Sequence, residues 1–133
     1  MKRIMAVGTV LLASLAVNVF AQDWYHERDE RFRGEQWRAH LLEQVRMDLD
    51  HIGSAWRAAD RERRRLDKTK EELTDLQTKM DHGRYDGGEL NDVIDSLTKS
   101  ANDQRLSGRD RDVLHDDTNR LMDYREHHDH WNR

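Results

Sequence analysis

Apolar residues recur at spacings of three and four through the middle of the chain. The positions that follow this spacing are Leu42, Val45, Leu49, Ile52, Trp56, Ala59, Arg63, Leu66, Lys70, Leu73, Leu76 and Met80. An average spacing of 3.5 residues places all of them along one side of an α-helix, as in a coiled coil. The pattern therefore predicts one long amphipathic helix from Glu35 to Asp81, with these residues as its seam.

Two seam positions, Arg63 and Lys70, are charged. Their aliphatic stems can cover an apolar seam while the charged groups reach water, so we expect them to weaken the helix without ending it. Gly53-Ser54 is the expected point of bending. At 1.5 Å per residue the helix would be about 70 Å long, and a rod of that length needs packing partners.

Two shorter helices are predicted in residues 82–133 and are expected to pack on the long one. Asp86 with Glu89, and Ser107 with Asp110, have the spacing of N-terminal capping boxes. The apolar stripes that follow these caps are Leu90, Val93, Ile94 and Leu97, and then Val113, Leu114, Leu121, Tyr124, His128 and Trp131. The predicted fold is all-α, with one long coiled-coil-like helix and two shorter helices that form a small bundle or hairpin.

Residues 1–21 have the pattern of a cleavable signal peptide. Lys2 and Arg3 are basic, the run from Ile4 to Val17 is apolar, and small residues precede a cleavage site after Ala21. The apolar run is shorter than the roughly 20 residues that span a membrane, so we expect no stable membrane anchor after cleavage. The pattern predicts a periplasmic or secreted protein.

The composition narrows the choice of partners. Charged residues make up 38% of the chain and the mean hydropathy is -1.10, values that would indicate disorder if the apolar residues were not periodic. The 23 basic and 27 acidic residues give a net charge of -4, and cleavage after Ala21 removes two of the basic residues, which leaves -6. We expect no nucleic-acid partner, because duplex binding needs a basic surface. Residues 22–34 mix aromatic and charged side chains without a clear period, so we expect a poorly ordered lead or a short helical turn there.

The C-terminal stripe contains the one candidate metal site. On a helix Asp123, His127 and His130 fall at i, i+4 and i+7, with His128 beside them, so one face could present a carboxylate and imidazoles to zinc or copper. The alternative is a solvated last turn, in which histidines favour the negative end of the helix dipole. We expect no tightly held cofactor.

Other motifs have simpler interpretations. Arg61 to Arg65 could attract an anionic surface, but neighbouring acids such as Asp60 and Asp67 favour a solvated face of mixed charge. No nucleophile elbow, zincin pair, phosphate loop or dinucleotide fingerprint occurs, so we expect no enzymatic activity.

Leu73-Thr74-Asp75-Leu76-Gln77 reads LTxxQ, and in this it resembles the Spy/CpxP family of periplasmic all-helical stress proteins. The resemblance implies an exported helical protein with a chaperone or stress-sensing role. The stretch from Asp86 to Trp131 is also similar to small exported proteins of unassigned function in soil bacteria, a resemblance that implies no activity.

Three hypotheses about function follow. The first is a non-enzymatic periplasmic protein that acts through its surface on a protein partner, in envelope stress or chaperoning. The second is a metal-binding or metal-sensing protein that uses Asp123, His127, His128 and His130. The third is a structural protein whose long helix self-associates through its seam.

Overall fold

The structure is a computed structural model, and it describes residues 23–55 and 60–131. These residues form helices and turns with no strand among them, so the predicted all-α class is confirmed. They fall into two compact units, one that ends at Trp37 and one that begins at Arg38. In the described part of the chain no helix is long and apolar enough to cross a membrane. The predicted signal peptide, residues 1–21, lies outside the described residues.

The N-terminal unit contains a helix over residues 23–31. For residues 22–34 the sequence predicts a poorly ordered lead or a short helical turn, and the structure has a helix over most of that stretch. Aromatic contacts follow it: the Phe32 and Trp37 rings lie 5.7 Å apart, and the Trp37 indole donates a hydrogen bond of 3.0 Å to the Gly34 carbonyl. Gly34 has a φ of 77°, a conformation that glycine adopts without strain, and it turns the chain after the helix.

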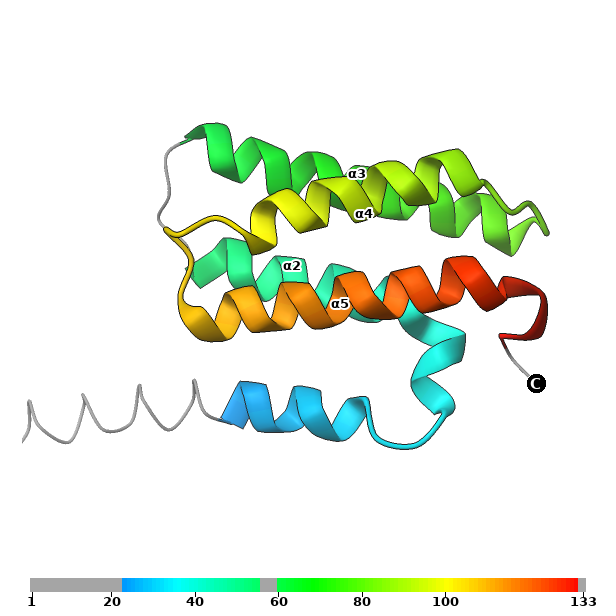
Figure 1. The fold of residues 1–133 in the computed structure, drawn as a ribbon, viewed down its shortest axis with the longest axis horizontal. Helices are drawn as coiled ribbons and strands as arrows, with labels where there is room; N and C mark the ends of the chain where they lie inside the picture. The colour runs from blue at the N-terminus through cyan, green and yellow to red at the C-terminus, as the bar shows by residue number, and fades with distance from the viewer. Residues whose placement is uncertain (1–22, 56–59, 132–133) are drawn as a thin grey trace, which may run out of the picture. The chain divides into compact units, whose positions relative to one another are not determined.

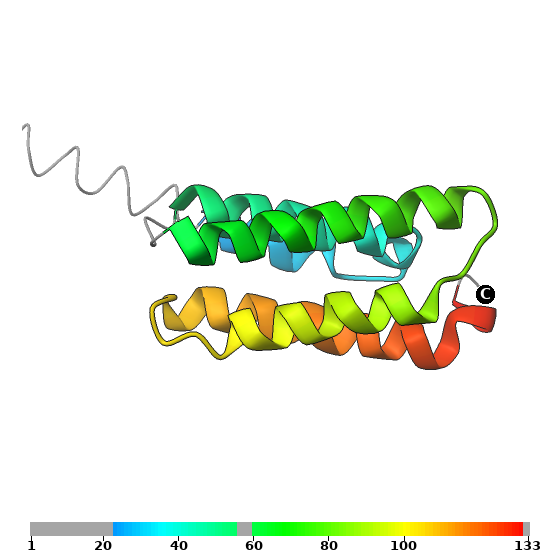
Figure 2. The same cartoon turned by 90° about the horizontal axis from the view of Figure 1, so that it is seen from above.

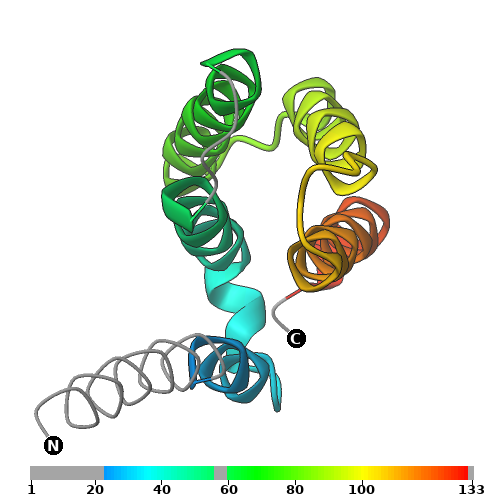
Figure 3. The ribbon, with the colours of Figure 1, turned by 90° about the vertical axis from the view of Figure 1, so that its left-hand side faces the viewer.

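The second unit is a bundle of four antiparallel helices (Figure 1). The elements from the unit boundary onward are η1 (Gln36–His40), which spans the boundary, and then α2 (Leu41–Ala55), α3 (Asp60–Asp81), α4 (Gly87–Ala101), α5 (Gly108–His127) and η2 (His128–His130). Each helix from α2 to α5 packs against the next, and α5 also packs against α2. The four helices therefore form a closed ring in the order α2, α3, α4, α5, which Figure 3 shows end-on. Figure 2 shows the same helices side-on, running along the length of the bundle.

The structure does not show the predicted single helix from Glu35 to Asp81. α2 ends at Ala55, α3 begins at Asp60, and the two helices lie side by side (Figure 1). The approach is close near Gly53, where a Cβ atom would lie 3.9 Å from Cδ1 of Leu66. Folding back brings the two halves of the seam together, and each half buries the apolar stripe of the other.

Most of the predicted seam residues are buried, and they fill the core of the bundle instead of lining one long helix. Leu49, Ile52, Leu66, Leu73 and Leu76 are all at most 1% exposed. Trp56 and Ala59 lie outside the described residues.

The two charged seam positions are not in the core. Arg63 is exposed. Thr69, and not the predicted seam residue Lys70, is the buried residue at this point of α3. The Lys70 ammonium lies 3.2 Å from carboxylate oxygens of both Asp50 and Asp67, so it bridges α3 to α2. Burial lowers the pKa of Lys70, but the hydrogen bonds to the two carboxylates outweigh it and the net shift is upward.

The structure confirms Asp86 and Ser107 as the N-cap residues of α4 and α5. The Asp86 carboxylate accepts the Glu89 amide at 3.0 Å, and the Ser107 hydroxyl accepts the Asp110 amide at 3.1 Å. Each bond satisfies one of the amides that the first turn of a helix leaves without a partner.

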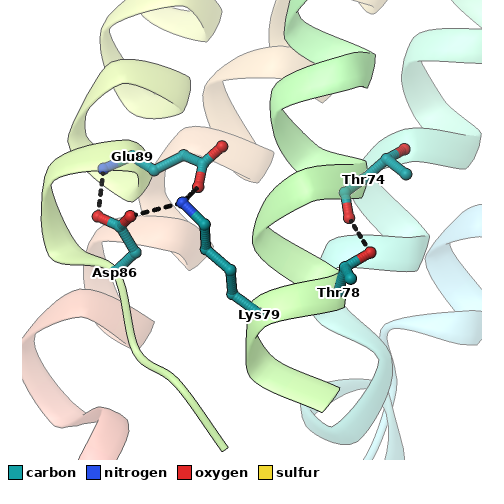
Figure 4. Close-up of polar contacts among 5 residues, drawn as sticks. All are labelled: Thr74, Thr78, Lys79, Asp86 and Glu89. Carbon is teal, nitrogen blue, oxygen red and sulfur yellow. Dashed lines mark hydrogen bonds and ion pairs between the residues drawn. The ribbon is translucent and has the colours of Figure 1, made fainter. Parts of the chain in front are cut away.

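The turn between α3 and α4 is held by one lysine. The Lys79 ammonium lies 2.8 Å from Asp86 Oδ2 and 2.7 Å from Glu89 Oε2 (Figure 4). The contacts raise the pKa of Lys79, and the nearby Lys79 ammonium in turn lowers the pKa of Asp86. Gly83, with a φ of 75°, ends α3 in the left-handed conformation. The end of α3 is thereby joined to the start of α4.

Candidate functional site

The candidate site lies at the end of the bundle where α2 begins and α3 and α5 end. A hollow of about 240 Å³ opens there, and we call it the end hollow. Its lining consists of Arg38, Ala39, Leu41, Leu42, Gln77, Met80, Tyr124, His128 and Trp131. Three helices and two short 3-10 segments contribute to it, so the site depends on the assembled bundle.

Aromatic rings form one wall of the end hollow. The Tyr124 and Trp131 rings meet edge to face at 5.3 Å, and Tyr85 meets Tyr124 in the same way at 6.1 Å. The His128 ring stacks on Tyr85 with the centroids 3.8 Å apart and the planes nearly parallel. Such pairs hold one another in fixed orientations, because the ring edges and faces carry opposite partial charges.

Met80 also lines the end hollow. The Tyr124 hydroxyl donates a hydrogen bond of 3.2 Å to the Met80 sulfur, which ties α5 to the end of α3. Burial raises the pKa of Tyr124 to about 12, and burial also raises the pKa of Tyr85. Both phenols therefore stay neutral throughout the physiological pH range, and the end hollow keeps an uncharged aromatic wall.

Arg38 supplies the positive charge at the site. The Trp131 indole donates a hydrogen bond of 2.8 Å to the Arg38 carbonyl, and the Arg38 guanidinium carbon lies 5.2 Å from the centre of the Trp131 ring. An arginine over an indole ring is held by a cation–π attraction. Arg38 and Trp131 are thus fixed relative to each other although 93 positions separate them in sequence.

A second hollow, of about 310 Å³, adjoins this pair, and we call it the histidine hollow. Its lining consists of Arg38, Asp123, His127, His130 and Trp131. Three of the four predicted metal ligands, Asp123, His127 and His130, line this hollow together, although α5 ends at His127 and His130 lies in η2. The His127 ring nitrogen lies 3.1 Å from an Asp123 carboxylate oxygen.

The fourth predicted ligand, His128, faces away into the end hollow. Its Nδ1 lies 3.2 Å from the Arg125 carbonyl and its Nε2 lies 3.2 Å from an Asp129 carboxylate oxygen. Among residues 23–55 and 60–131 no group of three or more His, Asp or Glu side chains is placed to hold a metal ion. Metal binding by this cluster stays a prediction.

The LTxxQ segment lies within α3 and serves the bundle itself. Leu73 and Leu76 are buried, and Thr74 accepts a hydrogen bond of 2.9 Å from Arg46 on α2. Thr74 in turn accepts through its carbonyl from the Thr78 hydroxyl at 3.0 Å (Figure 4). Only Gln77 of the motif reaches the end hollow.

Sequence reasoning did not identify Arg38, Ala39 or Tyr85 as site residues. Tyr124 and Trp131 carried a signal, since they continue the apolar stripe of α5, but that stripe indicates burial and not a hollow. In comparisons with known proteins, no protein-family model, no curated protein and no solved structure matches this chain.

Proposed function

We propose that this chain is an exported, non-enzymatic helical protein that binds apolar side chains of partner polypeptides in the end hollow, in a chaperone-like or envelope-stress role. The observation that carries the proposal is the lining of the end hollow, which includes Leu41, Leu42 and Met80 together with the rings of Tyr124 and Trp131. Apolar and aromatic walls with a few fixed polar groups are typical of binding sites.

The size of the end hollow fits one apolar side chain. A cavity of about 150 Å³ lined by apolar groups is sufficient to hold benzene, and the end hollow measures about 240 Å³. The rest of the surface offers little apolar area: in the described part of the chain the exposed large apolar side chains are Met47 and Tyr85, each 39% exposed. Tyr85 borders the aromatic wall, so apolar contact with a partner concentrates at this end.

The signal-peptide pattern of residues 1–21 supports export. A chain expressed in bacteria with its natural N-terminus should be recovered from the periplasm or medium with a mature N-terminus at Gln22, as read by mass spectrometry. Recovery of the uncleaved chain from the cytoplasm would contradict export and leave the binding proposal to be tested separately.

Binding is tested by an aggregation assay with an unfolding client protein. The bundle should suppress client aggregation, and Ala39→Phe should abolish this protection because Ala39 lines the end hollow and a phenyl ring would occupy it. His40→Phe is the matched control, since it adds the same ring at the next position, which is exposed and does not line the end hollow. Equal protection by both variants would refute binding in the end hollow.

The bundle gives no support to the third hypothesis, self-association of a long helix. The seam residues that it needs, such as Leu49, Leu66 and Leu73, are buried inside the bundle. A second copy would have to displace α4 or α5 to reach them.

A further inference from the structure

We propose that the end hollow and the histidine hollow together bind an apolar carboxylate, with the apolar group among the aromatic rings and the carboxylate on Arg38. This inference rests on the proposed function and names the class of ligand. The two hollows share Arg38 and Trp131 in their linings. A ligand that occupies both hollows would therefore contact that pair.

The two hollows differ in chemistry. The end hollow is lined by Leu41, Leu42, Met80, Tyr124 and Trp131, together with the polar Arg38, Gln77 and His128. In the histidine hollow every lining residue other than Trp131 is charged or titratable. An amphipathic ligand, apolar at one end and ionic at the other, matches this division.

The sign of the ionic group follows from the residues of the histidine hollow. Arg38 has a cationic guanidinium, the group whose planar N–H donors match a carboxylate. His127 and His130 line the same hollow. The one acid, Asp123, already lies 3.1 Å from the His127 ring. A cationic ligand would instead meet the Arg38 guanidinium, which opposes it.

Arg38 is also held in position for this task. Its carbonyl accepts the Trp131 indole N–H at 2.8 Å, and its guanidinium lies over the Trp131 ring. A pre-positioned guanidinium loses less side-chain entropy when it binds an anion than a mobile one does. The same chemistry is offered by the C-terminal residue of a polypeptide and by a free arylalkanoic acid.

The experiment compares three probes by isothermal calorimetry on the mature chain: N-acetyl-phenylalanine, its neutral amide, and N-acetyl-glycine. The acid should bind roughly tenfold or more tightly than the amide, since a hydrogen bond to a charged group contributes more than a neutral one. N-acetyl-glycine lacks the apolar group and should bind weakest. Gly-Gly-Gly-Phe and 3-phenylpropanoate then decide between a polypeptide C-terminus and a free acid.

Arg38→Gln should weaken binding of N-acetyl-phenylalanine by the same factor and leave binding of its amide unchanged. Arg84→Gln is the control, because Arg84 is exposed and lines neither hollow, and it should change the affinity for neither probe. Arg38→Lys, which keeps the charge, should lose less affinity for N-acetyl-phenylalanine than Arg38→Gln does. Equal binding of acid and amide to the unmodified chain would overturn the carboxylate inference and preserve apolar binding. If no probe binds and no client is protected, both the inference and the proposed function fail; if clients are protected and no probe binds, the inference alone fails.

Discussion

The Trp131 indole donates a hydrogen bond to the backbone carbonyl of Arg38, at 2.8 Å and across 93 residues of sequence. This bond joins the last described residue of the C-terminal segment to the segment that leads into α2. It fixes the wall shared by the two hollows, so its strength bears on both stability and binding.

Trp131→Phe should destabilise the bundle by about 1 kcal/mol, the typical net contribution of one hydrogen bond, because phenylalanine keeps the ring packing and removes the donor. Trp131→Ala should cost about 3 to 5 kcal/mol, since the side chain is 5% exposed and its removal leaves a cavity. Urea denaturation followed by circular dichroism measures both values. No effect of Trp131→Phe would show that the hydrogen bond contributes nothing to stability, and equal effects of the two variants would show that ring packing contributes nothing beyond it.

Leu49→Ala should destabilise the bundle by about 2 to 5 kcal/mol, because Leu49 is fully buried. Met47→Ala, the same kind of truncation on the same helix at a side chain that is 39% exposed, is expected to cost about 0.5 kcal/mol or less. Thermal melting of the two variants beside the unmodified chain is the measurement. Similar melting temperatures for both variants would contradict the packing of α2 described above.

Glu72→Gln should stabilise the bundle at neutral pH. Burial raises the pKa of Glu72, the neighbouring Lys68 lowers it, and the carboxylates of Asp92, Glu89 and Asp75 raise it further. A carboxyl group whose pKa is raised on folding contributes most at acid pH, and that contribution is lost as the pH rises through the raised value.

The melting temperature of Glu72→Gln should therefore equal that of the unmodified chain near pH 3 and exceed it at pH 7, where the carboxylate would be ionised. Glu71→Gln, one residue earlier and exposed, is the control and should shift little at either pH. A gain from Glu72→Gln that is the same at both pH values would point to a cause other than ionisation.

Asp86→Ala should lower the melting temperature, because it removes the N-cap of α4 and the Lys79 contact together. The pKa of Asp86 is lowered from 3.8, chiefly by the Lys79 ammonium, so its contribution is present above that value and disappears as the pH falls through the lowered one. A melting series from pH 7 down to about pH 2 should show the two proteins converging. Asp92→Ala, an exposed acid within the same helix, provides the comparison.

Zinc calorimetry tests the predicted metal site. We expect weak heats that are the same for the unmodified chain and for His127→Ala/His130→Ala, because the Arg38 guanidinium shares the hollow with these histidines and His128 is stacked on Tyr85. A stoichiometric heat that the double variant loses would establish a metal site and remove the basis of the carboxylate inference.

The local features of the fold could be predicted from sequence and the folding back of the seam could not. Capping by Asp86 and Ser107 depends on residues three positions away, so a short stretch of sequence contains the whole signal. A spacing of three and four is the same for one long helix and for two helices of a hairpin. With no proline in the chain, only Gly53-Ser54 marked the region near the break.

At the candidate site, too, local spacing could be predicted from the sequence and contacts between distant segments could not. Helical spacing placed Asp123 beside His127 on α5, but His130 lies in η2, beyond the end of that helix, although it lines the same hollow. It could not place Arg38 beside Trp131, because that contact exists only when α5 lies against α2. His128 was grouped with its neighbours in sequence, whereas its ring is oriented by Tyr85, which lies on a different segment.

The order of packing around the ring has a consequence for how the bundle is assembled. The pairs α2–α3, α3–α4 and α4–α5 are each joined by a short connection, so each can form as soon as its second helix is synthesised. The pair α2–α5 joins the first and last helices and has the largest loop-closure cost. We therefore expect α5 to dock on α2 in the last step of folding, and both hollows to be absent from every partly folded form that precedes it.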